Sequence, residues 1–318
     1  MKPAPFAYHA PASADDAVAL LESLGDGAKV IAGGQSLAPM LALRLAVFDH
    51  LVDVRKIEGL RGISRDNGSV RIGAGTTQAE IGRSDLVADT VPLLARATPL
   101  IGHFQIRNRG TIGGSLAHAD AAAEYPAVAL ALDAVVRTQS PRGLRTIPAA
   151  EFFTGIWTTA LEPDELLTAV EFPVWGGPSG GPGVRGCPPG STVGRPRRGR
   201  PPGEHCGFAV EEFAVRRGDF AIAGAAVAVE LSGTGTISRC GIGLFGLGPT
   251  ALRATAAEAA VTGAPAADVS ADEVGKSALA GLDSVPSDLH GSAAYRTRVG
   301  AAVVAAAWRR AIREANGD

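Results

Sequence analysis

The sequence predicts an α+β protein. In the N-terminal half, short apolar strands alternate with helices, and glycines follow the strand ends. In the C-terminal half, three long apolar segments come in succession and three helical segments follow them. Consecutive strands followed by consecutive helices are typical of an antiparallel sheet with helices packed on one face. The two halves therefore predict two different arrangements of helices and strands within one chain.

The N-terminal half begins with a helix and a strand. Ser13 followed three residues later by Asp16 is typical of a capped helix N-terminus, and this helix is predicted to run to Ser23. A short apolar strand is predicted at 29–32, directly before Gly33-Gly34. The other predicted elements are strands at 51–54, 70–74, 134–139 and 165–172 and helices at 77–83, 91–100 and 125–132.

The C-terminal half is predicted to fold as its own domain. Its strands are expected at 208–216, 221–231 and 236–245, and its helices at 250–261, 270–280 and 291–314. The preceding segment, 176–207, holds 11 Gly, 7 Pro and 5 Arg in 32 residues, so it lacks apolar side chains that would offset the entropy of ordering. We interpret it as a flexible loop or linker. Because its net charge is +4, a basic docking segment is the alternative.

Composition excludes several classes of function. The balance of 30 Lys and Arg against 32 Asp and Glu, with only 16 aromatic residues, does not suit a nucleic-acid groove. The longest apolar runs, 221–229 and 301–308, are far shorter than the roughly 20 residues of a membrane span. The N-terminus has no signal-peptide core, and three cysteines without a C-x-x-C pair cannot ligate an iron-sulfur cluster alone. A reducing cytoplasm is the expected location.

Two glycine-rich loops carry the main functional prediction. The first, at 32–36, reads AGGQS and leaves a predicted strand; the second, at 111–115, reads TIGGS. Paired glycines let a polyanion approach backbone N–H groups, and the serine hydroxyl adds a donor. Two such loops suit a dinucleotide whose diphosphate is held from two sides. The alternative is that each glycine pair only forms a tight turn.

A third glycine motif is interpreted differently. Residues 241–246 read GIGLFG and match the G-x-G-x-x-G fingerprint of a nicotinamide site. That fingerprint requires a helix to begin within it, whereas Gly248-Pro249 delays the next helix and no β-α-β unit precedes the motif. Close strand packing is therefore the better interpretation.

Polar residues near the second loop are less decisive. His103, His118 and Asp120 lie around it, but no metal-binding or hydrolase spacing is present, so we interpret them as residues that order the loop beside a cofactor. Arg107 and Arg109 suit either a phosphate or the solvated surface, and the sequence does not separate these alternatives.

Three stretches resemble a known family. AGGQSLAPMLALRLA at 32–46 and IRNRGTIGGSLAHADAAAEYPA at 106–127 closely resemble the two FAD-binding signatures of the flavoprotein, or medium, subunits of molybdenum hydroxylases. This family includes aerobic carbon monoxide dehydrogenase and the flavin portion of xanthine dehydrogenase. FAVEEFAVRRGDFAIAGAAVAVEL at 208–231 resembles the start of the family's C-terminal domain. Together the resemblance covers most of the chain.

The resemblance implies a domain organisation and a set of cofactor contacts. Two FAD-binding subdomains of the vanillyl-alcohol-oxidase (PCMH-like) type are expected at 1–56 and 57–175, an insertion at 176–207, and an α+β C-terminal domain of the CO dehydrogenase flavoprotein type at 208–318. The implied FAD-binding residues are, in the two pyrophosphate loops, Ala32, Gly33, Gly34, Gln35, Ser36, Thr111, Ile112, Gly113, Gly114 and Ser115, with Ile101 against the flavin, Glu124 in the ribose or phosphate region and Leu167 as a main-chain contact.

Two departures from the family pattern lie near the expected flavin position. Some relatives place a lysine there at the start of the C-terminal domain, where this chain has Glu211-Glu212, so no residue is assigned. The family usually joins the strand before the C-terminal domain to that domain by a short loop, whereas here 176–207 intervenes, either as a genuine insertion or as a reading-frame artefact.

The resemblance implies an electron-transfer subunit with FAD as its cofactor and no catalytic acid, base or metal of its own. Substrate would be hydroxylated on a large molybdopterin subunit. Electrons would pass through the iron-sulfur clusters of a small subunit to the FAD of this chain and then to an external acceptor, in a dimer of heterotrimers. A stand-alone flavin oxidase or reductase of the same fold and a flavin-free scaffolding subunit are the alternatives.

Overall fold

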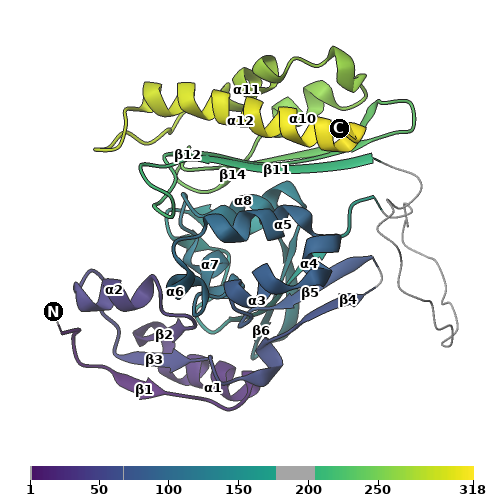
Figure 1. Cartoon of the computed structure of the whole chain (residues 1–318). Coiled ribbons are helices and arrows are strands. Elements are labelled where there is room, and N and C mark those ends of the chain that lie inside the picture. Colours follow the sequence, from purple (N-terminus) through teal and green to yellow (C-terminus); the bar gives the residue numbers. More distant parts are fainter. Residues whose placement is uncertain (1, 67, 177–204) are drawn as a thin grey trace, which may run out of the picture.

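The computed structural model describes residues 2–66, 68–176 and 205–318, which form three main β-sheets with helices around and between them (Figure 1). These helices and strands confirm the predicted α+β class. Most of the loop predicted at 176–207 lies outside the described residues. Of that segment, residues 205–207 belong to a strand rather than to a loop.

The first sheet is small and parallel, with the strand order β1-β3-β2. The first glycine loop follows β2 at the C-terminal edge of this sheet. Helix α1 packs on the sheet and is capped as predicted, because the Ser13 hydroxyl accepts a hydrogen bond from the N–H of Asp16 at 3.1 Å. The elements are β1 (Ala7–His9), α1 (Ala14–Leu24), η1 (Gly25–Gly27), β2 (Ala28–Ile31), α2 (Leu37–Ala42), β3 (His50–Asp53) and η2 (Glu58–Leu60).

The second sheet is antiparallel, with the strand order β4-β5-β10-β6-β7. Helix α1 contacts β10 and β6, so a small core that includes Val18, Leu21 and Leu166 joins the first layer to this sheet. The elements are β4 (Ile63–Asp66), β5 (Ser69–Gly73), β6 (Val135–Ser140), β7 (Gly143–Pro148), α9 (Ala149–Phe152), the hairpin of β8 (Phe153–Gly155) and β9 (Thr158–Thr159), and β10 (Leu166–Pro173).

A layer of helices lies between the second and third sheets (Figure 1). Thr77 begins this layer with a capping box, because its hydroxyl accepts from the N–H of Glu80 and the Glu80 carboxylate accepts from the N–H of Thr77. The elements are α3 (Gln78–Arg83), α4 (Asp85–Thr90), α5 (Pro92–Ala97), η3 (Thr98–Leu100), α6 (Phe104–Arg107), α7 (Ile112–His118) and α8 (Glu124–Ala131).

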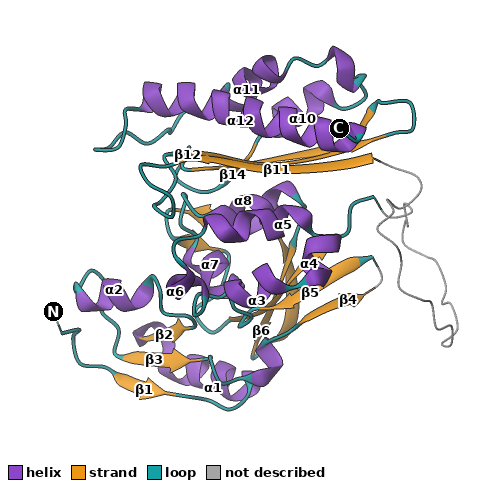
Figure 2. Ribbon diagram, viewed as in Figure 1, coloured by secondary structure: helices purple, strands orange, loops and turns teal. Residues whose placement is uncertain are grey.

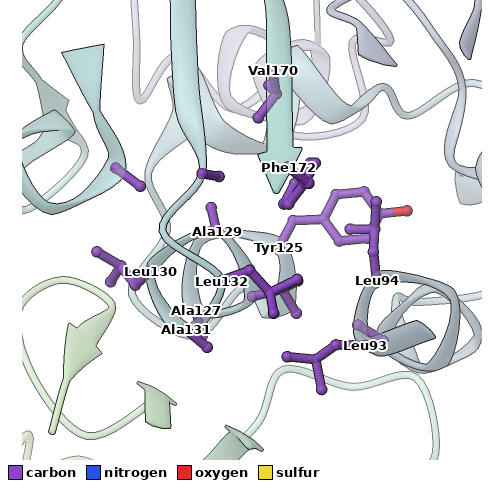
Figure 3. Close-up of a cluster of buried hydrophobic side chains, with 14 of the residues drawn as sticks. Leu93, Leu94, Tyr125, Ala127, Ala129, Leu130, Ala131, Leu132, Val170 and Phe172 are labelled. Carbon is purple, nitrogen blue, oxygen red and sulfur yellow. The ribbon is translucent and has the colours of Figure 1, made fainter. Parts of the chain in front are cut away.

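Helix α8 lies at the centre of a large core. All eight of its residues are buried, as expected for a helix that is apolar on nearly every side. Figure 3 shows Tyr125 and the alanines of α8 beside Leu93 and Leu94 of α5 and Phe172 of β10. The buried Tyr125 hydroxyl is paired with the Thr98 hydroxyl at 2.8 Å. Helix α8 is therefore enclosed by protein on all sides.

The third sheet is antiparallel, in the order β11-β12-β13-β14, and it lies between two layers of helices (Figure 2). Helices α10 to α12 cover one face as predicted, but α8 packs on the other face, and every residue of β12 is buried. The elements are β11 (His205–Phe213), β12 (Ala223–Leu231), β13 (Ile237–Phe245), β14 (Leu252–Arg253), α10 (Thr255–Val261), η4 (Ala266–Asp268), α11 (Ala271–Leu279) and α12 (Ala293–Asn316). None of the helices in the described ranges is long and apolar enough to cross a membrane.

Two boundaries in the C-terminal half differ from the prediction. Strand β11 spans His205–Phe213 rather than 208–216, because its pairing with β12 begins at His205, opposite Leu231. The helix predicted at 250–261 begins at Thr255, because the preceding residues pair with β13 as the short strand β14.

The first five residues of the GIGLFG motif, 241–245, end strand β13 and pack against α8, and Gly246 follows the strand. A Cβ added to Gly241 would lie 1.9 Å from the carbonyl oxygen of Ala131, and one added to Gly243 would lie 2.0 Å from that of Ala127. The glycines let the strand and the helix approach closely. The motif is a packing site, as interpreted from the sequence, and not a nucleotide fingerprint.

Candidate functional site

The two predicted glycine loops lie against each other. Gly33 is buried, and a Cβ added to it would lie 2.2 Å from the carbonyl oxygen of Arg109 and 2.7 Å from the Cα of Gly110. A Cβ added to Gly114 would lie 3.6 Å from the Cβ of Ala32. The fold therefore brings together two segments that are about 80 residues apart in the chain.

The first loop offers free backbone donors. Gly34 has a φ of +72°, and the Gln35 side chain donates to the carbonyl oxygen of Gly33 at 3.0 Å. Within the described part of the chain, no acceptor pairs with the N–H groups of residues 33–36 or with the Ser36 hydroxyl. Consecutive unpaired N–H groups around a left-handed residue are the arrangement that binds an anion. The loop is therefore suited to a diphosphate.

The second loop contributes differently. The N–H of Ile112 donates to the carbonyl oxygen of Thr76, that of Gly113 to Ala74, and that of Gly114 to the Thr111 hydroxyl, at 2.9–3.1 Å. Three of the N–H groups expected to face a diphosphate are thus paired within the protein. The second loop instead lets a ligand come close to its backbone, and it presents the Ser115 hydroxyl, which has no hydrogen-bond partner among the described residues.

Leu167 lies in the strand beneath the second loop. Its side chain is buried in the central core, and the carbonyl oxygen of the next residue, Thr168, accepts from the N–H of Ala74 at 2.9 Å. Ala74 in turn accepts from Gly113. These two backbone hydrogen bonds, from Gly113 to Ala74 and from Ala74 to Thr168, hold the second loop in place over β10.

Ile101 lies in a turn that touches the C-terminal domain. Arg107 donates to the carbonyl oxygens of Ile101 and Gly102, each at 2.8 Å, so it holds this turn rather than a phosphate. A Cβ added to Gly218, in the turn between β11 and β12, would lie 3.1 Å from the Gly102 oxygen. Arg109, whose role the sequence left open, is exposed.

Glu124, at the start of α8, is a buried carboxyl group with only 8% of its surface exposed. Burial raises its pKa to about 8, and the nearby carboxylates of Glu212 and Asp120 act in the same direction. Asp120 itself orders the segment before α8, since it accepts from the N–H of Ala122 at 2.8 Å. Glu124, at the end of the site, therefore lies in surroundings of low polarity, which is unusual for an acidic side chain.

His118 does not form an acid-base pair with Asp120. Its ring stacks on Trp157, with ring centroids 6.3 Å apart and an interplanar angle of 11°, and burial lowers its pKa. No group of three or more His, Cys, Asp or Glu in the described ranges has the arrangement of a metal site.

Sequence reasoning missed the polar cluster that supports the first loop. Asp53, at the end of β3, lies in register with Ile31 at the end of β2, and it accepts hydrogen bonds from Arg55 and from the Tyr8 hydroxyl. Burial opposes the charge on Asp53, but these hydrogen bonds outweigh burial and lower its pKa. Tyr8 precedes Asp53 by 45 residues, so no local pattern indicates the pair.

Among the hollows in the described part of the chain, one adjoins this arrangement and a larger one lies away from it. A cavity of about 480 Å³ adjoins the Ile101 turn and is lined by Pro99, Gly102, His103, Phe104, Gln105, Arg107 and Arg217. A larger one, of about 700 Å³, lies between α1 and the second sheet and contains none of the predicted cofactor contacts. The loops, the Ile101 turn and Glu124 therefore form the candidate site, although the larger hollow lies elsewhere.

The fold and the paired loops define a flavoprotein, and comparison with known families agrees. The model described as "FAD binding domain in molybdopterin dehydrogenase" matches residues 4–175, and the model described as "CO dehydrogenase flavoprotein C-terminal domain" matches residues 208–311. The first match alone covers more than half of the chain. The chain therefore belongs to the FAD-binding flavoprotein family of molybdopterin dehydrogenases.

Individual relatives cover almost the whole chain. The 6-hydroxypseudooxynicotine dehydrogenase complex subunit alpha of Paenarthrobacter nicotinovorans is 40% identical over 299 residues, which span 94% of this chain and 92% of the relative. The carbon monoxide dehydrogenase medium chain of Hydrogenophaga pseudoflava is 36% identical over 314 residues, 98% of this chain and 99% of the relative.

Solved structures agree with the sequence comparison. Carbon monoxide dehydrogenase from Hydrogenophaga pseudoflava matches with a TM-score of 0.86 at 38% identity, covering 98% of both chains. Quinoline 2-oxidoreductase from Pseudomonas putida 86 matches with a TM-score of 0.84 at 32% identity, covering 99% of both chains. The predicted family, fold, FAD cofactor and oxidoreductase class are confirmed. The individual FAD contacts and the domain boundaries stay predictions.

Proposed function

We propose that this chain is the electron-transfer flavin subunit of a cytoplasmic molybdenum hydroxylase complex. It takes electrons from the iron-sulfur clusters of a small partner subunit and passes them to an external acceptor, while a large molybdopterin subunit hydroxylates the substrate. The relatives' names support this assignment, because they describe a subunit of a dehydrogenase complex and a medium chain. We extend the proposal to a dimer of such heterotrimers.

The cysteine count supports a division of labour between chains. The chain has three cysteines, fewer than the four thiolates that an iron-sulfur cluster ordinarily requires. Electrons must therefore arrive from clusters held by another chain.

One observation carries the proposal: Gly33 lies against Arg109 and Gly110, while the N–H groups of residues 33–36 have no hydrogen-bond partner in the part of the chain that the structure describes. The residues fit FAD, because a diphosphate between the loops would meet these donors and the hydroxyls of Ser36 and Ser115. The proposed contacts are those of the two loops, together with Ile101, Glu124 and Leu167.

Bound FAD supplies the two-electron chemistry of its isoalloxazine ring. The residues of the chain bind and orient it. The first loop would donate to the diphosphate, and Arg107 holds the turn that carries Ile101. The turn at Gly218, between β11 and β12, packs against Gly102 in that same turn. No side chain is assigned as a catalytic acid or base.

The test is purification of the tagged full-length chain from its native host. We expect about one FAD per chain, read from the visible absorbance of the flavin, and co-purification of a larger molybdenum-containing subunit and a smaller iron-sulfur subunit. Flavin without partners would instead indicate a stand-alone oxidase or reductase. Partners without flavin, even after incubation with FAD, would indicate a scaffolding subunit and would overturn the proposal.

A further inference from the structure

The backbone around the start of α3 pairs with the second glycine loop. Thr77 and Thr111 form an antiparallel bridge, and the N–H of Gln78 donates to the carbonyl oxygen of Gly110 at 2.8 Å. Gln78 is the first residue of α3, and Gly110 directly precedes the second loop. These contacts fix the position of Gln78 relative to the loop.

The side chain of Gln78 lies against Gly110. A Cβ added to Gly110 would lie 2.6 Å from the Oε1 of Gln78 and 3.0 Å from its Cδ. Gly110 also touches the first loop, because a Cβ added to Gly33 would lie 2.7 Å from the Cα of Gly110. Only Gly110 therefore separates the Gln78 amide from Gly33, so the amide lies where the two loops meet.

The Gln78 amide has no hydrogen-bond partner among the described residues. Its Oε1 is fully enclosed by protein, and the residue as a whole is only 5% exposed. Its Nε2 is also unpaired but is not fully enclosed, so a ligand can reach this end of the amide. An unpaired amide in the interior is costly, and in native proteins such a group usually pairs with a ligand or an ordered water.

The surroundings favour an anion as the partner of this amide. A glutamine amide offers either its Nε2, which donates, or its Oε1, which accepts, and the hydrogen-bond network decides which end faces a ligand. Beyond Gly110, the N–H groups of residues 33–36 have no partner in the described part of the chain, so the first loop offers donors. A ligand that uses these donors also suits a donating Nε2 beside them.

We propose that Gln78 is a further FAD contact, whose Nε2 donates to the diphosphate from the side of the second loop. This inference rests on the proposed function. It gives the second loop a donor that its own backbone lacks, because the N–H groups of residues 112–114 are paired within the protein. The first loop then binds through its backbone, whereas the second binds through the side chains of Gln78 and Ser115.

This role has opposite effects on folding and on binding. In the flavin-free protein the unpaired amide destabilises the folded state, so Gln78→Met, which is similar in length and has no amide, should raise the unfolding temperature. The same change removes a donor to a charged group, so it should raise the FAD dissociation constant about tenfold or more. A residue that only supported the packing of the loop would move both quantities in the same direction.

Gln78→Glu tests the donor itself. A protonated carboxyl group can donate as the amide does, whereas an ionised one only accepts and repels a diphosphate. The affinity of this variant relative to the wild type should therefore be near one at low pH and fall as the pH rises and the new carboxyl group ionises. A packing role gives no reason for such a pH dependence.

The experiment uses the complex that contains the full-length chain, freed of flavin and titrated with FAD between about pH 5 and pH 8 by flavin fluorescence. Thermal unfolding of each flavin-free complex is recorded alongside. Asn108→Asp is the matched control, because it makes the same amide-to-acid change on an exposed side chain two residues before Gly110. We expect this control to bind FAD within about twofold of the wild type at each pH.

Three results would overturn the inference. The first is a Gln78→Met protein that binds FAD within about twofold of the wild type, which would leave only water at the amide. The second is a Gln78→Met protein that loses affinity and unfolds at a lower temperature, as a packing role requires. The third is a Gln78→Glu protein whose relative affinity does not change with pH.

The two variants at Gln78 are independent, so the failure of one to fold leaves the other as the test. A wild-type complex that binds no FAD at any pH would be a different failure, because it would remove the proposed function itself.

Discussion

Replacing Gly33 by alanine should push the two glycine loops apart. The new Cβ would lie 2.2 Å from the carbonyl oxygen of Arg109, and because real Cβ contacts are essentially never below 3.0 Å, the loops must separate by at least about 0.8 Å. The opposing atoms belong to backbone and cannot rotate away. Overpacking of this kind costs about 1–3 kcal/mol, which corresponds to an FAD dissociation constant raised about 5- to 150-fold if the cost falls on binding.

The assay is a fluorescence titration of the flavin-free complex with FAD, paired with thermal unfolding. Gly59→Ala is the matched control, because a Cβ at that position meets no atom within 4 Å. It should leave both measurements unchanged. The reasoning would be refuted by a Gly33→Ala protein that binds FAD within about twofold of the wild type and unfolds at the same temperature.

Three further predictions concern packing and protonation. Gly243→Ala should lower the free energy of unfolding by about 1–3 kcal/mol, because its Cβ would lie 2.0 Å from the Ala127 oxygen; an unchanged urea midpoint would contradict this. Burial raises the pKa of Glu212 from 4.5 to about 7, so the folded state keeps a proton that the unfolded state loses, and stability falls as the pH rises through this interval. Glu212→Gln should therefore stabilise the flavin-free chain more at about pH 8 than at about pH 5, and equal shifts in urea midpoint would argue against it. Burial also raises the pKa of the Cys240 thiol to about 11, so mass spectrometry should find it unmodified by iodoacetamide in the folded chain near pH 7.5 and modified in urea.

Elements with a local pattern could be predicted from the sequence. The caps at Ser13 and Thr77 depend on residues only three positions apart, and both are present. The start of α10 could not be predicted, because residues 252–253 become a strand only through pairing with β13. Intrinsic strand propensity is a property of the segment itself, whereas a strand at the edge of a sheet forms only by pairing with its neighbouring strand.

The candidate site likewise combines features that the sequence indicated with features that it could not show. Paired glycines indicated both loops, but the sequence could not show that Thr76 and Ala74 pair with the N–H groups of the second loop. Nor could it show that Glu212 lies near Glu124, since the direction of a strand side chain depends on register. The structure therefore distinguishes a loop with free donors from one that mainly permits close approach.

The close contact between α8 and β13 limits how this family can exchange parts. A Cβ at Gly241 or Gly243 would meet the backbone of α8 at Ala131 or Ala127, so β13 can lie this close to the helix only with glycine at both positions. A chimera that joins residues 1–175 of one family member to the C-terminal domain of another would need glycine at both of these strand positions. Recombination at the boundary near residue 208 should therefore be tolerated only when the donor of the C-terminal domain has both glycines.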